Sequence, residues 1–60
     1  MTGTVVEIKR FKHKTYGFIK ADTSYYFNLN DVLGGNVNIG DDVDFEVKGD
    51  RAVNVKLSNP

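Results

Sequence analysis

The 60-residue chain has no cysteine, no long apolar run and no formal net charge. Without cysteine it can form neither a disulfide framework nor a thiolate metal site, and a reducing compartment is compatible with it. A membrane-spanning helix needs about 20 consecutive apolar residues, and the opening Met-Thr-Gly-Thr lacks the charged and apolar regions of a signal peptide. We therefore expect one small soluble domain over residues 1–60, located in the cytoplasm and without a membrane partner.

Groups that could perform catalysis are also scarce. His13 is the only histidine, it stands among lysines, and no nucleophile with a matching base is evident. Asp41 and Asp42 form a carboxylate pair, but they follow Gly40 at the start of an expected strand, which is typical of a turn. No cluster of histidines and carboxylates has metal-ligand spacing. We expect no enzymatic activity, no metal, no cofactor and no small-molecule substrate.

The zero net charge conceals an uneven distribution along the chain. Residues 1–20 contain five basic residues against one acidic residue, whereas residues 21–60 contain three basic and seven acidic residues. If the two parts form different faces, one face attracts a polyanion and the other repels it. A charge run that is merely solvated is the alternative interpretation.

Alternation of apolar and polar residues dominates the sequence and predicts strands. The clearest strand covers residues 42–48, with Val43, Phe45 and Val47 facing inward. Gly49 and Asp50 suit a tight turn, and a second strand at 51–57 resumes the alternation. Its expected inward residues are 53, 55 and 57. These two strands are predicted to form a hairpin.

Three further strands are expected at residues 4–9, 16–21 and 25–29. In the first strand, the core candidates Val5 and Ile8 break the alternation, which indicates a bulge. Residues 30–33 resemble one helical turn, and residues 34–40 form the longest loop. Five short strands with tight connections predict an all-β fold, a five-stranded antiparallel barrel of the OB type, because closure removes exposed edges. The strand pattern also fits an SH3-like barrel.

Aromatic side chains mark the candidate functional surface. Tyr16 and Phe18 share one face of their strand, and Tyr26 is expected beside them, while Ile19 and Phe27 take the core side. A chain this short cannot supply a second core for these aromatics, so they indicate a binding surface. A basic loop, residues 9–14 (Lys-Arg-Phe-Lys-His-Lys), precedes them. Exposed rings can stack on bases for about 1–3 kcal/mol each while cations neutralise phosphates.

Several segments resemble motifs of one family. Residues 14–19, Lys-Thr-Tyr-Gly-Phe-Ile, resemble the first ribonucleoprotein motif of cold-shock domains, normally Lys-Gly-Phe-Gly-Phe-Ile. Residues 24–32, Ser-Tyr-Tyr-Phe-Asn-Leu-Asn-Asp-Val, are similar to the second motif, normally Asp-Val-Phe-Val-His-Phe-Ser-Ala-Ile. Residues 3–5, 40–47 and 52–55 also match in order and spacing. The resemblance to the cold-shock domain family therefore extends over nearly the whole chain.

This resemblance implies an OB-fold barrel that binds single-stranded DNA or RNA across its first three strands, often as an RNA chaperone. We expect the protein to be a monomer. The resemblance also implies that Lys14, Tyr16, Phe18 and Tyr26 stack on bases or meet the backbone, and it places Asn28 and Leu29 where the family has a histidine and a phenylalanine. Together with the basic loop, the expected nucleic-acid-binding residues are Lys9, Arg10, Phe11, Lys12, His13, Lys14, Tyr16, Phe18, Tyr26, Asn28 and Leu29.

Departures from the family pattern predict weaker binding or a shifted preference. Glu7 stands where the family usually has an exposed tryptophan, Thr15 replaces a glycine, and Leu29 cannot stack like an aromatic ring. The connection between the first two strands is longer by about two residues, and Phe11 there offers part of the lost stacking. Losing one or two stacking rings, at roughly 1–3 kcal/mol each, lowers affinity about tenfold or more.

Two other functions are compatible with the same sequence. A degenerate cold-shock barrel could act as a protein-interaction module, which zero net charge and Glu7 favour. Another OB-fold RNA binder, such as a ribosome-associated or translation-initiation module, shares the partner class. Salt dependence separates nucleic-acid binding from a protein interface, because phosphate contacts weaken steeply with added salt.

Overall fold

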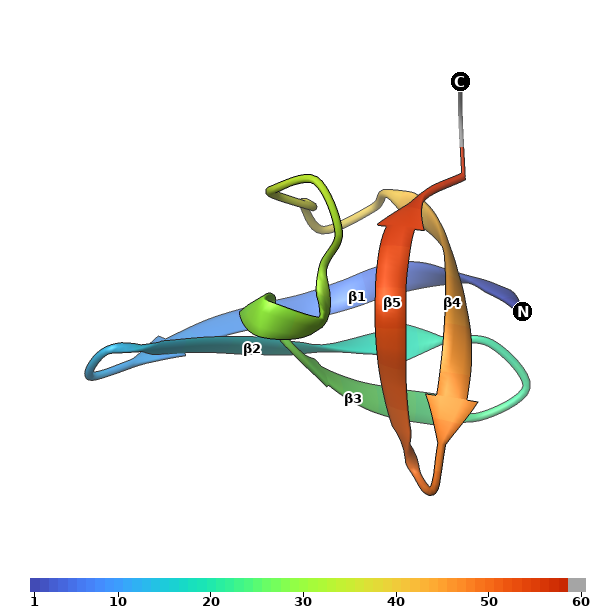
Figure 1. The fold of residues 1–60 in the computed structure, drawn as a ribbon, viewed down its shortest axis with the longest axis horizontal. Coiled ribbons are helices and arrows are strands. Elements are labelled where there is room, and N and C mark those ends of the chain that lie inside the picture. The colour runs from blue at the N-terminus through green and yellow to red at the C-terminus, as the bar shows by residue number, and fades with distance from the viewer. Residues whose placement is uncertain (59–60) are drawn as a thin grey trace.

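The computed structural model describes residues 1–58, which form a closed barrel of five strands (Figure 1). The elements are β1 (Thr2–Phe11), β2 (Lys14–Lys20), β3 (Ser24–Asn28), the short 3₁₀ turn η1 (Leu29–Asp31), β4 (Asp42–Lys48) and β5 (Arg51–Leu57). Around the barrel the strand order is β1-β2-β3-β5-β4, and β4 pairs back with β1. The predicted all-β, OB-type barrel is confirmed, and β4 and β5 have the predicted bounds. Nowhere in residues 1–58 is there a helix long and apolar enough to cross a membrane.

One strand pair corrects the prediction of a purely antiparallel barrel. The β3–β5 pair is parallel and consists of a single residue pair, Tyr26 opposite Arg51. Val32 extends this closure by a parallel bridge to Val55, and the Leu33 N–H donates to the Val55 carbonyl over 2.7 Å. The parallel direction arises because η1 and residues 32–41 separate β3 from β4, and the β4–β5 hairpin then returns β5 alongside β3. The alternation of apolar and polar residues along a single strand does not indicate whether its neighbour in the sheet is parallel or antiparallel.

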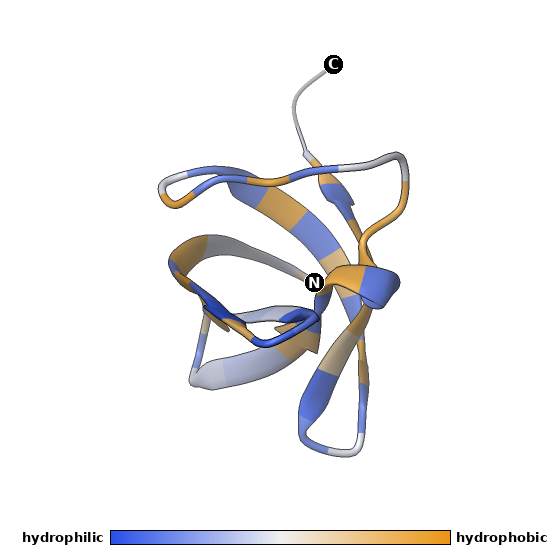
Figure 2. Cartoon of the chain, turned by 90° about the vertical axis from the view of Figure 1, so that its left-hand side faces the viewer, coloured by the Kyte–Doolittle hydropathy of each residue, from blue (hydrophilic) through white to orange (hydrophobic). Residues whose placement is uncertain are grey.

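The core lies between the inner faces of all five strands. Val5, Ile19, Val43 and Val55 are fully buried. They pack in one cluster whose remaining members are Tyr25, Phe27, Val37, Phe45 and Ala52. Figure 2 shows the corresponding alternation of hydrophobic and hydrophilic residues along the strands. The inward residues predicted for β2 and β3 are confirmed.

A bulge in β1 explains why two core residues lie three positions apart. Val5 pairs with Ile19, but Glu7 pairs with Phe18, so β1 contains one extra residue at this point. The extra residue changes the face on which later side chains lie, and Ile8 therefore turns toward the core, where it is partly buried. The predicted bulge is confirmed.

The prediction of strict alternation in β5 is wrong. Val55 is fully buried as expected, but Leu57 at the strand end is 51% exposed, and Ala52 replaces Val53 as the fully buried residue. The exchange of Val53 for Ala52 results from a second bulge, where the register against β4 shifts and Asn54 adopts a φ of 52°. Beyond a bulge, every side chain changes face. Leu57 shares the face of Val55 and is exposed at the end of the strand.

Val47 in β4 was also predicted to face the core and is instead 40% exposed. It lies one residue from the end of its strand, beside the predicted turn at Gly49 and Asp50, where the hairpin extends from the barrel (Figure 1). The opposite wall of the barrel does not cover this end of the hairpin.

The long connection at residues 32–41 closes one end of the barrel. It is attached to β1 by two backbone hydrogen bonds, from the Val5 N–H to the Asp41 carbonyl (2.9 Å) and from the Gly40 N–H to the Val5 carbonyl (2.7 Å). Val37 from the middle of this segment is 7% exposed and joins the core. The helical turn precedes it at residues 29–31, slightly earlier than the predicted 30–33.

Candidate functional site

Gly17 fixes how closely the strands of the candidate site approach each other. A Cβ atom at this position would collide with the backbone carbonyl oxygen of Glu7 and would lie 2.9 Å from the Phe27 ring. A side chain at residue 17 would therefore push β1 and β3 away from β2. Because side chains alternate along a strand, the residues on either side of this glycine, Tyr16 and Phe18, lie on the outer surface of the sheet.

Three rings form an aromatic face, defined here as Tyr16, Phe18 and Tyr26. The ring centroids of Tyr16 and Tyr26 are 5.8 Å apart with an interplanar angle of 27°. Phe18 meets Tyr26 edge-on, with a centroid distance of 6.0 Å and an angle of 73°. Tyr26 is 36% exposed, and the other two are partly buried. The sequence prediction that these three rings share one surface is confirmed.

Lysines border the aromatic face. Lys9 pairs with Tyr16 across the β1–β2 ladder, and directly paired residues project from the same side of a sheet. Lys14 and Lys20 stand two residues before Tyr16 and two residues after Phe18 in β2, so the period-two geometry places them on the outer side as well. The sequence prediction included Lys9 and Lys14 but omitted Lys20.

Arg51 is a further cation that the sequence prediction missed. Its guanidinium carbon lies 5.9 Å from the centroid of the Tyr26 ring, and its Nη2 donates to Asp31 Oδ2 over 2.7 Å. This hydrogen bond, with the charge of Asp31, raises the pKa of Arg51. Asp31 Oδ2 also accepts from the Asn28 N–H (3.1 Å), so one carboxylate fixes both η1 and the start of β5. The sequence places Arg51 at the start of β5, but its position beside Tyr26 could be predicted only if β5 were known to lie beside β3.

The side chain of Asn28 caps η1. Asn28 pairs with Tyr16 and thus belongs to the outer side of β3. Its Oδ1 accepts a hydrogen bond from the Asn30 N–H over 3.0 Å, within a capping box. Its amide group at Nδ2 is the part that could still donate to a ligand.

Glu7 interrupts the positive border of the face. It pairs with Phe18, which in turn pairs with Tyr26, so the carboxylate continues a row of two aromatic residues across three strands. Its Oε2 is 3.7 Å from Lys9 Nζ, and about half of each side chain is exposed. An exposed ion pair of this kind contributes little to stability. Glu7 therefore places a negative charge beside the rings and partly neutralises Lys9.

The structure corrects the prediction of a basic loop at residues 9–14, because most of these residues belong to strands. β1 continues to Phe11 and β2 begins at Lys14, which leaves only Lys12 and His13 in the turn. The hairpin extends beyond the barrel (Figure 1). At its tip, Phe11 is 63% exposed, and Lys12 Nζ lies 5.5 Å from its ring centroid. The hairpin tip is thus a separate surface from the aromatic face, and Lys14 lies between the two.

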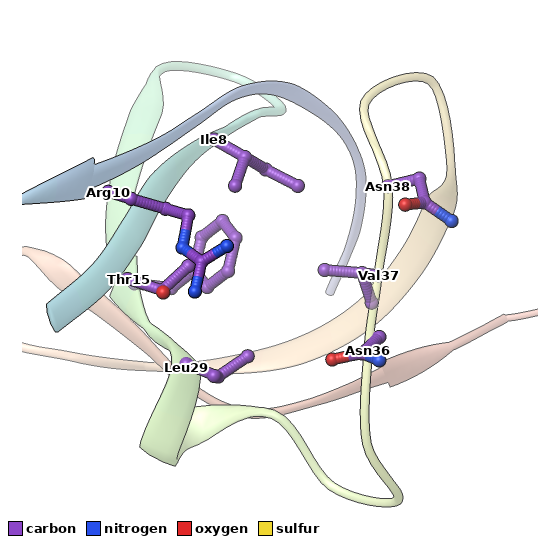
Figure 3. Close-up of a pocket in the computed structure, with 8 residues that line it drawn as sticks. Ile8, Arg10, Thr15, Leu29, Asn36, Val37 and Asn38 are labelled. Carbon is purple, nitrogen blue, oxygen red and sulfur yellow. The ribbon is translucent and has the colours of Figure 1, made fainter. Parts of the chain in front are cut away.

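Because residues 9 and 10 are in a strand, their side chains lie on opposite faces. Lys9 borders the aromatic face, but Arg10 points toward a pocket of about 420 Å³ between the hairpin and residues 36–38 (Figure 3). Leu29, 39% exposed, lines the same pocket. The eleven predicted residues thus divide among the aromatic face, the hairpin tip and this pocket.

Comparisons of the chain with protein-family models, with curated proteins and with solved structures find no match. Among residues 1–58, no three histidine, cysteine, aspartate or glutamate side chains come together as a metal-ion site would require.

Proposed function

We propose that the aromatic face binds single-stranded DNA or RNA, in the manner of a cold-shock protein with an RNA chaperone role. The observation that carries the proposal is the contact of Tyr16, Phe18 and Tyr26 on the outer side of β2 and β3. A separate cluster already fills the barrel, so the fold does not need these rings for its core. Aromatic rings grouped on a surface are typical of a binding site.

The ring arrangement suits unpaired bases. Tyr16 and Tyr26 are inclined by 27°, so the pair offers neighbouring ring surfaces to successive bases, and Arg51 lies near the ring of Tyr26. Stacking of a base on an aromatic ring contributes about 1–3 kcal/mol and tolerates any base, since each base has a π-face. We therefore expect binding with little sequence preference at the aromatic face.

The lysines supply the second part of the affinity. Lys9, Lys14 and Lys20 lie on the outer side of the sheet that carries the rings. For single strands, the logarithm of affinity falls with the logarithm of salt concentration with a slope of about −0.7 for each neutralised phosphate. Three phosphate contacts give an expected slope of about −2.

Substitutions at Tyr16 test the proposal. Tyr16→Ala removes a stacking ring and should weaken binding of an oligonucleotide of about seven nucleotides by roughly 5- to 150-fold. Tyr16→Phe keeps the ring and should bind like the unmodified protein. Leu57→Ala, which shortens an exposed apolar side chain on β5, controls for general loss of surface. Circular dichroism should show the same fold in all variants, and equal affinity of a folded Tyr16→Ala variant would contradict the proposal.

One observation favours the protein-interaction alternative. Glu7 lies in the same cross-strand row as Phe18 and Tyr26, where its charge repels phosphate. A protein partner that binds the rings through apolar contacts would respond much less to added salt than phosphate contacts do. Absence of oligonucleotide binding at low salt would shift the assignment to this function.

A further inference from the structure

The pocket between the β1–β2 hairpin and residues 36–38 combines an apolar lining with polar groups. Its volume is about 420 Å³, within the range of roughly 300–1,000 Å³ that is usual for small-molecule sites. Its lining includes the apolar side chains of Ile8, Phe27, Leu29 and Val37 and the polar side chains of Arg10 and Thr15. Of these, Phe27 and Val37 are buried, so the floor is held by the core.

Arg10 is the charged group of the pocket. Figure 3 shows its guanidinium extending into the space bounded by Ile8, Thr15 and Leu29, with Val37 on the opposite wall. The ion pairs found within residues 1–58 involve Lys9 with Glu7 and Arg51 with Asp31, and neither they nor the side-chain hydrogen bonds include Arg10. The donors of Arg10 are therefore free to meet a ligand.

The composition of the lining selects the class of ligand. A phosphate group would lose hydration against the apolar side chains of Ile8, Leu29 and Val37, and such a loss is costly for a charged group. A planar heteroaromatic ring fits better, because its faces contact apolar side chains while its edge hydrogen-bonds. A nucleobase is such a ring.

The guanidinium also discriminates among bases. Arginine has five N–H donors in a rigid fork and no acceptor. The O6 and N7 atoms of guanine are two adjacent acceptors that match this fork. The corresponding edge presents one acceptor and one donor in adenine, one acceptor in thymine or uracil, and a donor in cytosine. Guanine is therefore the base that Arg10 recognises best.

The pocket adjoins the aromatic face at two places. Asn28 pairs with Tyr16 on the face, and the next residue, Leu29, lines the pocket. On the hairpin, Lys9 borders the face and the next residue, Arg10, reaches the pocket. A nucleic-acid strand that is bound along the aromatic face can thus direct the base of one nucleotide into the adjoining pocket.

We propose that the pocket holds one guanine base of the bound strand, with its O6 and N7 accepting hydrogen bonds from Arg10. The inference rests on the proposed function for the strand itself, but the base site can be tested separately. This base site would make binding specific for guanine at one nucleotide position, whereas the aromatic face accepts any base.

The first experiment compares oligo-dT of seven nucleotides with a series carrying a single dG at each position. One position should bind about fivefold more tightly or better, the discrimination expected from a bidentate arginine–guanine contact. Arg10→Lys keeps the charge but loses the fork, so this variant should lose the preference for dG over dT. If Arg10→Ala instead weakened every oligonucleotide equally and reduced the salt slope, Arg10 would be a phosphate contact and the inference would be wrong.

The second experiment does not depend on the aromatic face. Guanosine monophosphate should shift the methyl NMR signals of Ile8, Leu29 and Val37, whereas thymidine monophosphate, which supplies the same phosphate, should not. The shifts should disappear in Arg10→Lys. Pocket shifts without any binding of oligo-dT would refute only the proposed function. Absence of both the shifts and the dG preference would refute the base site.

Discussion

Replacing Glu7 by tryptophan should convert a repulsive position on the aromatic face into a stacking platform. Residue 7 pairs with Phe18, which pairs with Tyr26, so an indole there would extend the aromatic row by one ring. The side chain is about half exposed, and a larger group can occupy the outer surface without entering the core. The change also frees Lys9 from its partner at 3.7 Å.

Two effects contribute to the expected gain, and their sizes differ. Removing a unit charge about 8 Å from a phosphate relieves about 0.5 kcal/mol in water, roughly a twofold change in affinity. A new stacked base contributes about 1–3 kcal/mol, or roughly 5- to 150-fold. We therefore expect Glu7→Trp to tighten oligonucleotide binding about tenfold or more, mainly through stacking.

Glu7→Gln separates the two effects, because it removes the charge and adds no ring. It should tighten binding about twofold at low salt, and this gain should shrink at 0.1 M salt, where the screening length is about 10 Å. The tryptophan gain should persist at that salt concentration. Fluorescence anisotropy of a labelled oligo-dT measures both. Unchanged affinity of a folded Glu7→Trp variant would refute the placement of residue 7 on the binding face.

Two further predictions concern the fold. Gly17→Ala should lower the free energy of unfolding by about 3 kcal/mol, at the upper end for overpacking, because the new methyl group collides with the Glu7 carbonyl oxygen. Urea denaturation measures this change. A loss below about 1 kcal/mol would contradict the described strand spacing. The Tyr25 hydroxyl donates to Asp22 Oδ1 over 2.9 Å, and this hydrogen bond, with burial and the charge of Asp22, raises the pKa of Tyr25 above its ordinary 10.0. The folded state thus favours the neutral phenol, and this stabilisation is complete below the unfolded-state pKa and is lost as pH rises through the folded-state pKa. Denaturation of the protein and of Tyr25→Phe at pH 8 and at pH 11 should give a difference that shrinks at the higher pH; a constant difference would contradict this role of the hydrogen bond.

Much of the fold could be predicted because alternation is regular where strands are regular. The β4 and β5 bounds follow from that pattern and from Gly49. The wrong inward residue Val53 arises because a bulge at Asn54 resets the alternation, whereas Val47 and Leu57 lie near strand ends, where the alternation continues without burial. Asparagine is among the non-glycine residues that adopt positive φ most readily, so the sequence permits the bulge there but does not require it.

The candidate site was predictable where it depends on one strand and its nearest neighbour. The aromatic face follows from period two in β2 and β3. The separation of Arg10 from Lys9 is not predictable from the dense basic run at residues 9–14, because that composition favours a loop, in which neighbouring side chains have no fixed faces. Arg51 was missed for a different reason, since its contact with Tyr26 depends on barrel closure between strands distant in the sequence.

The most direct test of the central claim is a titration of the protein with oligo-dT and oligo-U of about seven nucleotides, a length within the usual range for one OB fold. Tyrosine emission is the signal, because the chain has no tryptophan. We predict saturable quenching whose affinity falls with salt with a logarithmic slope of about −2. Absence of any response at low salt and high oligonucleotide concentration would contradict the assignment of the aromatic face to single-stranded nucleic acid.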